Sequence, residues 1–110
     1  MATAVLVGNG TIQLSAISAD WSLASSTDKT GQYNKLGNGI FISYIRFEPQ
    51  AASDTVVIKD TNDSGPIIAH LQAASTNDMP VLEINAWKRP YLDYSLCKFG
   101  TGAKVWIDFL

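Results

Sequence analysis

The sequence predicts an all-β fold: a single compact antiparallel β-sandwich or jelly-roll-like domain of about eight short strands, spanning residues 1–110. Three observations support this prediction. Short runs rich in β-branched and aromatic residues alternate along the chain with clusters of Gly, Asn, Asp, Ser and Pro. These clusters recur about every 8–12 residues, which is the spacing of turns in sandwiches and barrels. With 110 residues, 46% of them apolar, the chain can bury one core.

The first two strands are expected on either side of Asn9-Gly10, in the runs TAVLV and TIQLS, because Asn-Gly is a strong hairpin signal. The conformation of residues 18–37 is left open by the sequence. Ser, Thr, Gly and Asn dominate this segment and favour a long loop, with Trp21 anchoring one end in the core. A short helix is the alternative, since four apolar residues recur at helical spacing. These are Leu14, Ile17, Trp21 and Ala24.

The run GIFISYIRFE, residues 39–48, is the clearest predicted strand. Successive side chains of a strand point to opposite faces, so the residues divide into two sets. One set is Phe41, Ser43, Ile45 and Phe47, and the other is Ile40, Ile42, Tyr44 and Arg46. Both faces are largely apolar in the first half of the run, which is typical of a central strand covered on two sides.

Two β-prone runs, TVVIKD and PIIAHLQ, flank the stretch Asp60–Gly65. Oxygen-bearing side chains at alternate positions followed by a glycine match the first half of a calcium-binding loop. Such a loop carries a bidentate Glu at its twelfth position, where this chain has Leu71, and it is flanked by helices. The stretch is therefore predicted to be the turn of a hairpin, with a weakly bound cation as the alternative. No metal site is predicted.

The last third of the chain predicts further strands. In residues 81–87, Val81, Glu83 and Asn85 alternate with Leu82, Ile84 and Ala86. Pro90 has no backbone donor, which indicates an edge position or a bend. After the run LCKF and the turn GTG, a final strand alternates cleanly and is expected to bury one face. That face consists of Ala103, Val105, Ile107 and Phe109.

The composition disfavours several classes of function. The formal net charge is −2, and the eight basic residues are scattered along the chain, so neither nucleic acid nor an anionic membrane is an expected partner. The chain has no apolar run of the ~20 residues that a membrane helix requires. Its N-terminus has no basic segment of the kind that begins a signal peptide, and Cys97 is the single cysteine. A protein made and kept in a reducing compartment is expected.

No arrangement typical of catalysis is evident, and the chain is predicted not to be an enzyme. His70 is the only histidine, and its run IIAHLQ predicts a histidine in the core or on a sheet surface. Glu83, Asp93 and Asp108 match a glycosidase only in residue type. The glycines occur in turns, and none follows a strand to open a helix as in phosphate-binding loops. No cofactor is predicted.

Aromatic residues are concentrated in the last quarter of the chain, from Trp87 to Trp106. Large aromatic side chains bury ~150–250 Å² each and fill cores or subunit interfaces. The residues chosen as a candidate interface are Trp87, Tyr91, Tyr94 and Trp106. The alternative is a platform on which sugar rings stack, as in a carbohydrate-binding β-sandwich module.

Two long runs, YIRFEPQAASDTVVIKDTNDSGPIIAHL and WKRPYLDYSLCKFGTGAKVWIDFL, resemble the small accessory virion proteins of tailed bacteriophages. The resemblance covers residues 38–110 and rests on the succession of strands: an aromatic-ended strand, a valine-rich strand, a glycine-containing turn, a second apolar strand and a closing aromatic strand. It implies a capsid cement or decoration protein, made in the host cytoplasm and located on the capsid surface. Such proteins have no catalytic residues, often form trimers, and bind the major capsid protein. Another phage structural component, of the tail or the head–tail junction, is the alternative.

Overall fold

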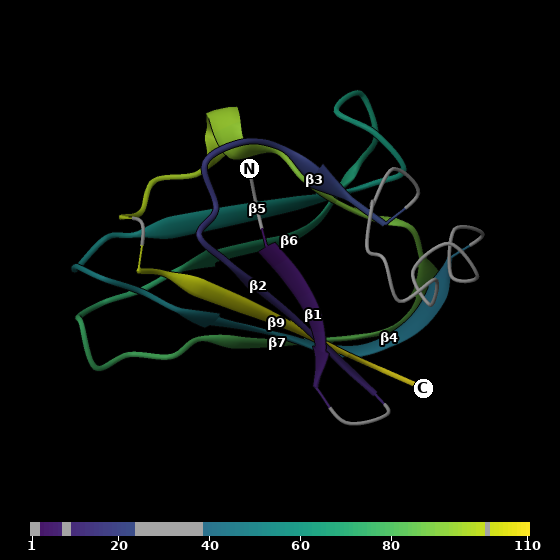
Figure 1. Ribbon diagram of the computed structural model, residues 1–110, viewed down its shortest axis with the longest axis horizontal. Coiled ribbons are helices and arrows are strands. Elements are labelled where there is room, and N and C mark those ends of the chain that lie inside the picture. The colour runs from purple at the N-terminus through teal and green to yellow at the C-terminus, as the bar shows by residue number, and fades with distance from the viewer. Residues whose placement is uncertain (1–2, 8–9, 24–38, 101) are drawn as a thin grey trace.

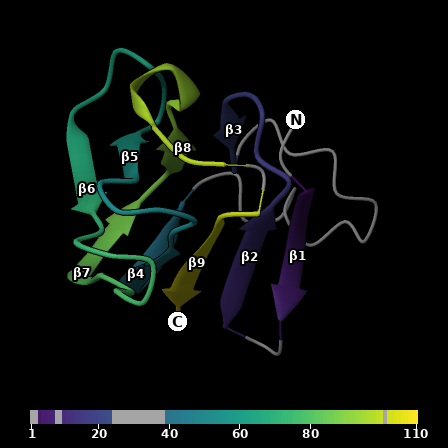
Figure 2. The same cartoon turned by 90° about the vertical axis from the view of Figure 1, so that its left-hand side faces the viewer.

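The computed structural model describes residues 3–7, 10–23, 39–100 and 102–110, and for residues 3–7 the backbone only. Two antiparallel sheets lie face to face (Figures 1 and 2), which confirms the predicted all-β sandwich. In order across the first, five-stranded sheet lie β1 (Thr3–Val7), β2 (Thr11–Ser15), β9 (Lys104–Phe109), β4 (Ile40–Glu48) and β7 (Val81–Lys88). In order across the second, four-stranded sheet lie β3 (Trp21–Ser22), β8 (Pro90–Leu92), β5 (Thr55–Asp60) and β6 (Ile67–Gln72).

The pairing of the strands gives a jelly roll. β5 pairs with β6, β4 with β7, β3 with β8, and β2 with β9, all antiparallel. The chain is therefore one long hairpin that doubles back at the turn between β5 and β6 and is then rolled up. Each further pair outward from that turn lies in the other sheet, apart from the added edge strand β1. This is the two-sheet arrangement that the jelly-roll prediction describes.

The inner faces of both sheets supply one apolar core. The inward-facing isoleucine, leucine and valine side chains of β2, β4, β5, β6, β8 and β9 are almost completely inaccessible, together with Phe47. Ala103, Val105 and Ile107 are buried and Phe109 packs against the same cluster, so the predicted inner face of the last strand is confirmed. β9 lies between β2 and β4, so this apolar C-terminal strand has both its partners within the chain.

The predicted faces of β4 are wrong. Ile40, Ile42, Ile45 and Phe47 are all buried, whereas Tyr44 is 43% exposed. The register of β4 shifts between Ile42 and Tyr44 against both neighbouring strands. Such a bulge adds one residue to a strand and reverses the alternation beyond it. The buried residues of β4 are therefore even-numbered before the bulge and odd-numbered after it. One face of the strand is exposed, so β4 is not covered on both sides.

Pro90 marks the corner where the chain leaves the first sheet after β7 and enters the second as β8. The predicted bend is correct, but the predicted edge position is wrong, because β8 lies between β3 and β5. Pro90 is the first residue of its strand, where a missing backbone donor is tolerated. Beyond β8 the chain forms a short 3₁₀ helix, η1 (Tyr94–Leu96), and Lys98 makes an isolated bridge to Thr55.

The N-terminal part agrees with the sequence in two respects. β1 and β2 pair as the expected hairpin, with Val7 opposite Thr11. Trp21 is only 7% exposed and belongs to the core, which confirms its role as an anchor. The alternative of a helix through Trp21 is wrong, since this residue begins β3. Most of the predicted long loop, residues 24–38, lies outside the described residues. Within the described residues no helix is long and apolar enough to cross a membrane.

Candidate functional site

The structure does not bring the four predicted interface residues together on one face of the sandwich. Trp87 and Trp106 lie on strands β7 and β9 of the five-stranded sheet. Tyr91 lies on β8 of the four-stranded sheet, and Tyr94 lies in η1, which follows that strand. The tyrosine of η1 packs edge-on against Phe99, with ring centroids 5.9 Å apart. The four residues are close in sequence, but they do not form one surface.

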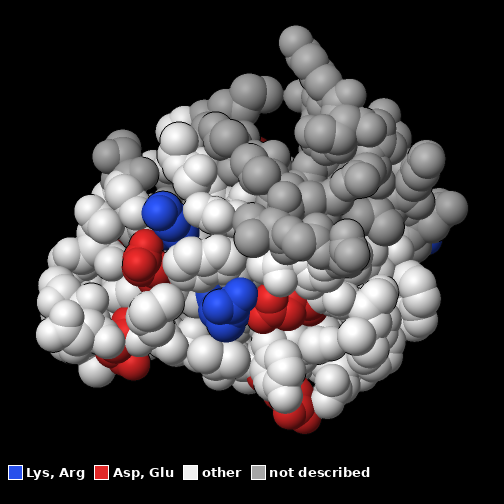
Figure 3. Space-filling view, turned by 60° about the horizontal axis from the view of Figure 1, so that its bottom comes forward, with Lys and Arg blue, Asp and Glu red and all other residues white. Residues whose placement is uncertain are grey.

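The outer face of the five-stranded sheet carries two rows of outward-facing side chains, each running across four strands. The first row is Val81, Arg46, Trp106 and Gln13. The second row is Glu83, Tyr44, Asp108 and Thr11. Figure 3 views the molecule from the side where β4 and β7 lie in Figure 1, and most of the described surface visible there is uncharged.

The charges at the centre of this outer face neutralise one another. Arg46 donates from Nε and Nη2 to the two carboxylate oxygens of Asp108, at 2.8 and 3.0 Å. Thr11 donates its hydroxyl to the same carboxylate at 2.7 Å. The guanidinium also lies 5.3 Å from the ring centroid of Trp106, within cation–π range. The arginine is thus held by a bidentate partner and an aromatic ring.

Exposed apolar side chains collect along the β7 side of the same sheet. We call Met79, Val81, Trp87 and Tyr44 the β7 stripe; their exposed fractions are 46%, 53%, 67% and 43%. The first three come from β7 or the residues just before it, and Tyr44 lies opposite Glu83 of β7. Asn85 has a φ of 49° at the bulge in β7, and a bulge of this kind blunts a sheet edge against pairing with another chain. The side chains of the stripe, and not its backbone edge, are therefore the available contact.

The outer face of the four-stranded sheet holds a polar network that we call the clasp: Asp20, Lys59, Tyr91, Asp93 and Ser95. Lys59 Nζ lies 2.9 Å from Asp93 Oδ2, and it also donates to the carbonyl oxygen of Asp63 at 2.7 Å. Ser95 donates to the other oxygen of Asp93 at 2.7 Å. The side chains of Lys59 and Asp93 are 14% and 8% exposed, so this ion pair is largely buried.

The second half of the clasp fixes the segment before β3. The Tyr91 hydroxyl donates to Asp20 Oδ2, and the Tyr94 backbone N–H donates to Asp20 Oδ1. The hydrogen bond to Asp20 raises the pKa of Tyr91 to about 12. The hydrogen bond from Lys59, and then that from Ser95, lowers the pKa of Asp93. The ionisable side chains of the clasp are therefore bonded to other residues of the protein, which indicates a structural role.

Neither His70 nor Cys97 is placed for nucleophilic chemistry. His70 is exposed on β6, on the sheet surface. The Cys97 thiol lies 3.3 Å from the backbone nitrogen of Val57 and accepts its hydrogen bond, at a point where β5 has no strand partner on that side. Burial, followed by the nearby Asp93 and Asp20 carboxylates, raises the pKa of this thiol to about 11. Among the described residues no group of three or more His, Cys, Asp or Glu could hold a metal ion.

The Asp60–Gly65 stretch is the turn of the β5–β6 hairpin, as predicted, and hence the turn at which the whole roll doubles back. A Cβ at Gly65 would lie 1.8 Å from the carbonyl oxygen of Asp60, so only glycine fits there. Asp60 Oδ1 accepts a hydrogen bond from the Arg89 backbone N–H at 2.9 Å, and the Thr61 N–H donates to the Arg89 carbonyl at 2.7 Å. The turn therefore holds the corner between β7 and β8.

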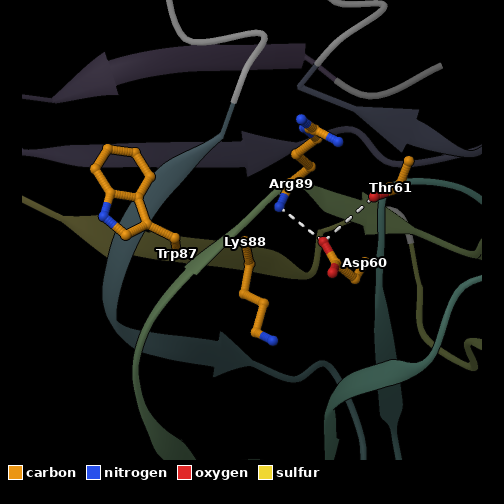
Figure 4. Close-up of a pocket in the computed structure, with 5 residues that line it drawn as sticks. All are labelled: Asp60, Thr61, Trp87, Lys88 and Arg89. Atoms are coloured by element: carbon orange, nitrogen blue, oxygen red, sulfur yellow. Dashed lines mark hydrogen bonds between the residues drawn. The ribbon is translucent and has the colours of Figure 1, made fainter.

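A shallow depression of about 210 Å³ lies at this corner, lined by Asp60, Thr61, Trp87, Lys88 and Arg89 (Figure 4). Sequence reasoning singled out Trp87 and Asp60 separately but did not bring them together. They are far apart along the chain, and the pairing of β5 with β8 makes them neighbours: Asp60 lies opposite Pro90. No pattern within a single strand could have indicated this site.

No protein-family model matches the chain, and no curated protein or solved structure gives a significant match to it.

Proposed function

We propose that this protein is a structural virion component, a cement or decoration subunit that binds and stabilises a phage head as a homo-oligomer. The observation that carries the proposal is the β7 stripe, a set of exposed apolar side chains beside the Arg46–Asp108 ion pair. Glu83, on the same strand, accepts a hydrogen bond from Asn85. Trimeric assembly is favoured, with the major capsid protein or another virion protein as the partner. The protein would be made in the host cytoplasm and act on the capsid surface without catalysis or a cofactor.

The energetics of the outer face favour burial against another protein. Burying an unpaired charge costs several kcal/mol, but Arg46 and Asp108 would enter an interface already bonded to each other. Trp87 and Tyr44 are of the residue types that most often dominate binding energy in interfaces. Met79 and Val81 extend the apolar contact along the strand. An interface of standard size buries about 800 Å² per partner, which a face of four strands can provide.

The jelly roll agrees with the proposal at the level of fold. Jelly rolls recur in viral capsid proteins, and also in lectins and cupins, so the fold alone does not choose among these functions. In this chain the space between the sheets is filled by apolar side chains, including Phe47, Ile58 and Leu92. Recognition on the outer surface therefore suits the described part of the molecule better than a ligand held between the sheets.

The test combines oligomeric state with capsid binding. Sedimentation of the purified chain is expected to show an oligomer, and the chain is expected to co-sediment with phage heads that lack it. Trp87→Ala should weaken capsid binding or assembly at least tenfold, since a central aromatic anchor contributes about 2 kcal/mol or more. Val81→Ser should weaken it as well, but by less, because a smaller apolar side chain is removed from the contact. Leu96→Ala is the matched control, because Leu96 is 48% exposed but lies in η1, beyond the four-stranded sheet.

A monomer that binds no capsid or virion would refute the proposal. So would variants in the β7 stripe that assemble and bind as the unmodified chain does. A tail or head–tail component would use the same kind of surface, and separate binding measurements with purified heads and purified tails distinguish this alternative.

A further inference from the structure

We propose that the corner between β7 and β8 is a binding site for an acidic saccharide, with Trp87, Lys88, Arg89, Asp60 and Thr61 as its recognition residues. The inference goes beyond the virion role: the depression lies beside the β7 stripe and shares Trp87 with it, whereas Lys88, Arg89, Asp60 and Thr61 belong to the depression alone. Of the aromatic residues considered for a sugar-binding platform, this proposal uses only Trp87. Trp106 lies two strands away and is partly occupied by Arg46.

The charge of the depression selects for an acidic ligand. Lys88 and Arg89 contribute two positive charges and Asp60 one negative charge. Neither cation forms an ion pair with any residue that the structure describes. Figure 4 shows that the side chains of Lys88 and Arg89 extend from the corner in opposite directions, and both residues line the depression. A carboxylate that enters from either side meets a donor, and the guanidinium can bind a carboxylate through two parallel hydrogen bonds.

The remaining residues suit a sugar better than other anions. The indole of Trp87 is 67% exposed, and its electron-rich face attracts the polarised C–H groups on one side of a pyranose ring. Asp60 accepts the Arg89 N–H through Oδ1, and Oδ2 can accept a sugar hydroxyl. Thr61 adds a second hydroxyl partner.

The site is small and preorganised. At about 210 Å³ it falls below the ~300–1,000 Å³ typical of drug-sized ligands, which restricts it to one or two rings of a longer chain. Two hydrogen bonds between the turn and the corner hold it in place, at 2.7 and 2.9 Å. Thr61 has a φ of 75°, which a β-branched residue rarely adopts, and such strained residues cluster at functional sites. Rigidity of this kind lowers the entropy lost on binding.

The experiment titrates the full chain by calorimetry with a trimer of α-1,4-linked galacturonic acid. The same trimer with methyl-esterified carboxyl groups is the matched ligand, since it keeps the rings and removes the charge. We expect the acidic trimer to bind at least tenfold more tightly than the ester, and its affinity to fall as salt rises. Trp87→Ala should weaken binding about tenfold, because an aromatic ring contact contributes about 0.5–1.5 kcal/mol beyond the area that it buries. The double variant Lys88→Gln/Arg89→Gln should abolish the preference for the acid.

Matched variants separate this site from the rest of the surface. Tyr44→Ala removes an exposed aromatic ring outside the depression, and Lys98→Gln/Lys104→Gln removes two cations elsewhere; neither should change binding. Four results would overturn the inference: no binding of the acidic trimer, equal affinity for the ester, loss of affinity in the matched variants, or equal binding of an Asp-Glu peptide through the same residues. Lys88→Gln/Arg89→Gln should leave assembly and capsid binding intact. A failure of the saccharide proposal is therefore distinguishable from a failure of the virion proposal.

Discussion

The ion pair between Lys59 and Asp93 provides the sharpest test of how the outer side of the four-stranded sheet is held together. Both side chains are largely buried, and the pair links β5 to the segment that follows β8. We consider the substitution Lys59→Met, which retains most of the aliphatic stem but removes the ammonium group. The Asp93 carboxylate then keeps only the hydroxyl of Ser95 as a side-chain partner among the described residues.

The expected loss of stability follows from this burial. Removing one partner of a buried ion pair typically costs ~3–5 kcal/mol, because the remaining charge is left without compensation. The Asp93 side chain is 8% exposed and retains its hydrogen bonds from the hydroxyl and the backbone of Ser95, so we expect the lower end, about 3 kcal/mol. For a domain of this size that corresponds to a decrease in Tm of roughly 10–15 °C. In Lys59→Met/Asp93→Asn neither charge remains, so the double variant should lose less than the sum of the single variants.

The pH dependence gives a second readout of the same pair. The pKa of Asp93 is lowered in the folded protein, chiefly by the hydrogen bond from Lys59. A lowered folded-state pKa means that the stabilisation is complete above the ordinary Asp value of about 3.9 and is lost as the pH falls through the folded-state pKa. The stability difference between the unmodified chain and Asp93→Asn should therefore be full at neutral pH and shrink in acid.

Urea unfolding, followed by tryptophan fluorescence at neutral and acidic pH, measures both effects. The matched control is Arg46→Met, which breaks the ion pair on the opposite face of the sandwich. The side chains of that pair are 38% and 25% exposed, so its loss should cost only about 1 kcal/mol. A cost below about 1 kcal/mol for Lys59→Met, or equal costs for the two variants, would show that the buried pair does not stabilise the fold as argued.

Three further substitutions or treatments test separate contacts. Gly65→Ala should destabilise the chain by at least ~2 kcal/mol in urea, because its Cβ would overlap a backbone oxygen; an unchanged midpoint would mean that the turn can relax. Tyr91→Phe should lose ~1 kcal/mol at neutral pH. The pKa of about 12 for Tyr91 makes this contribution complete below pH ~10 and lost as the pH rises through 12, so an equal difference at high pH would contradict the assignment. Cys97 should react with iodoacetamide at pH ~8 far more slowly in the folded chain than in urea, which mass spectrometry measures, because its pKa is about 11.

The sequence predicted correctly those features that depend on residues close together in the chain. The turn at Asp60–Gly65 was identified because its residue types satisfy backbone conformations within a few positions. The inner face of β9 was identified because its alternation is uninterrupted. In β4 the prediction from alternation is wrong after Ile42. The bulge there depends on the pairing with β7 and β9, and no residue type in β4 indicates it.

The candidate sites were less predictable than the fold. Trp21 and Trp87 are the same residue type, yet the first is 7% exposed and the second 67%. Composition cannot distinguish them, since exposure depends on which strand covers each ring. The sequence grouped Trp87 with Tyr91, whereas the structure places them on strands of different sheets, because the chain passes from one sheet to the other at the Pro90 corner.

The sequence by itself determined the class of fold, the positions of most strands and the hairpin turn, because these follow from residue preferences and alternation over short distances. Only the tertiary structure decided that the turn is the centre of a rolled hairpin, and that Asp60 joins Lys88 and Arg89 at one corner. The physical reason is that these neighbours are set by strand pairing between distant segments, which responds to the burial of the whole core and not to any local pattern.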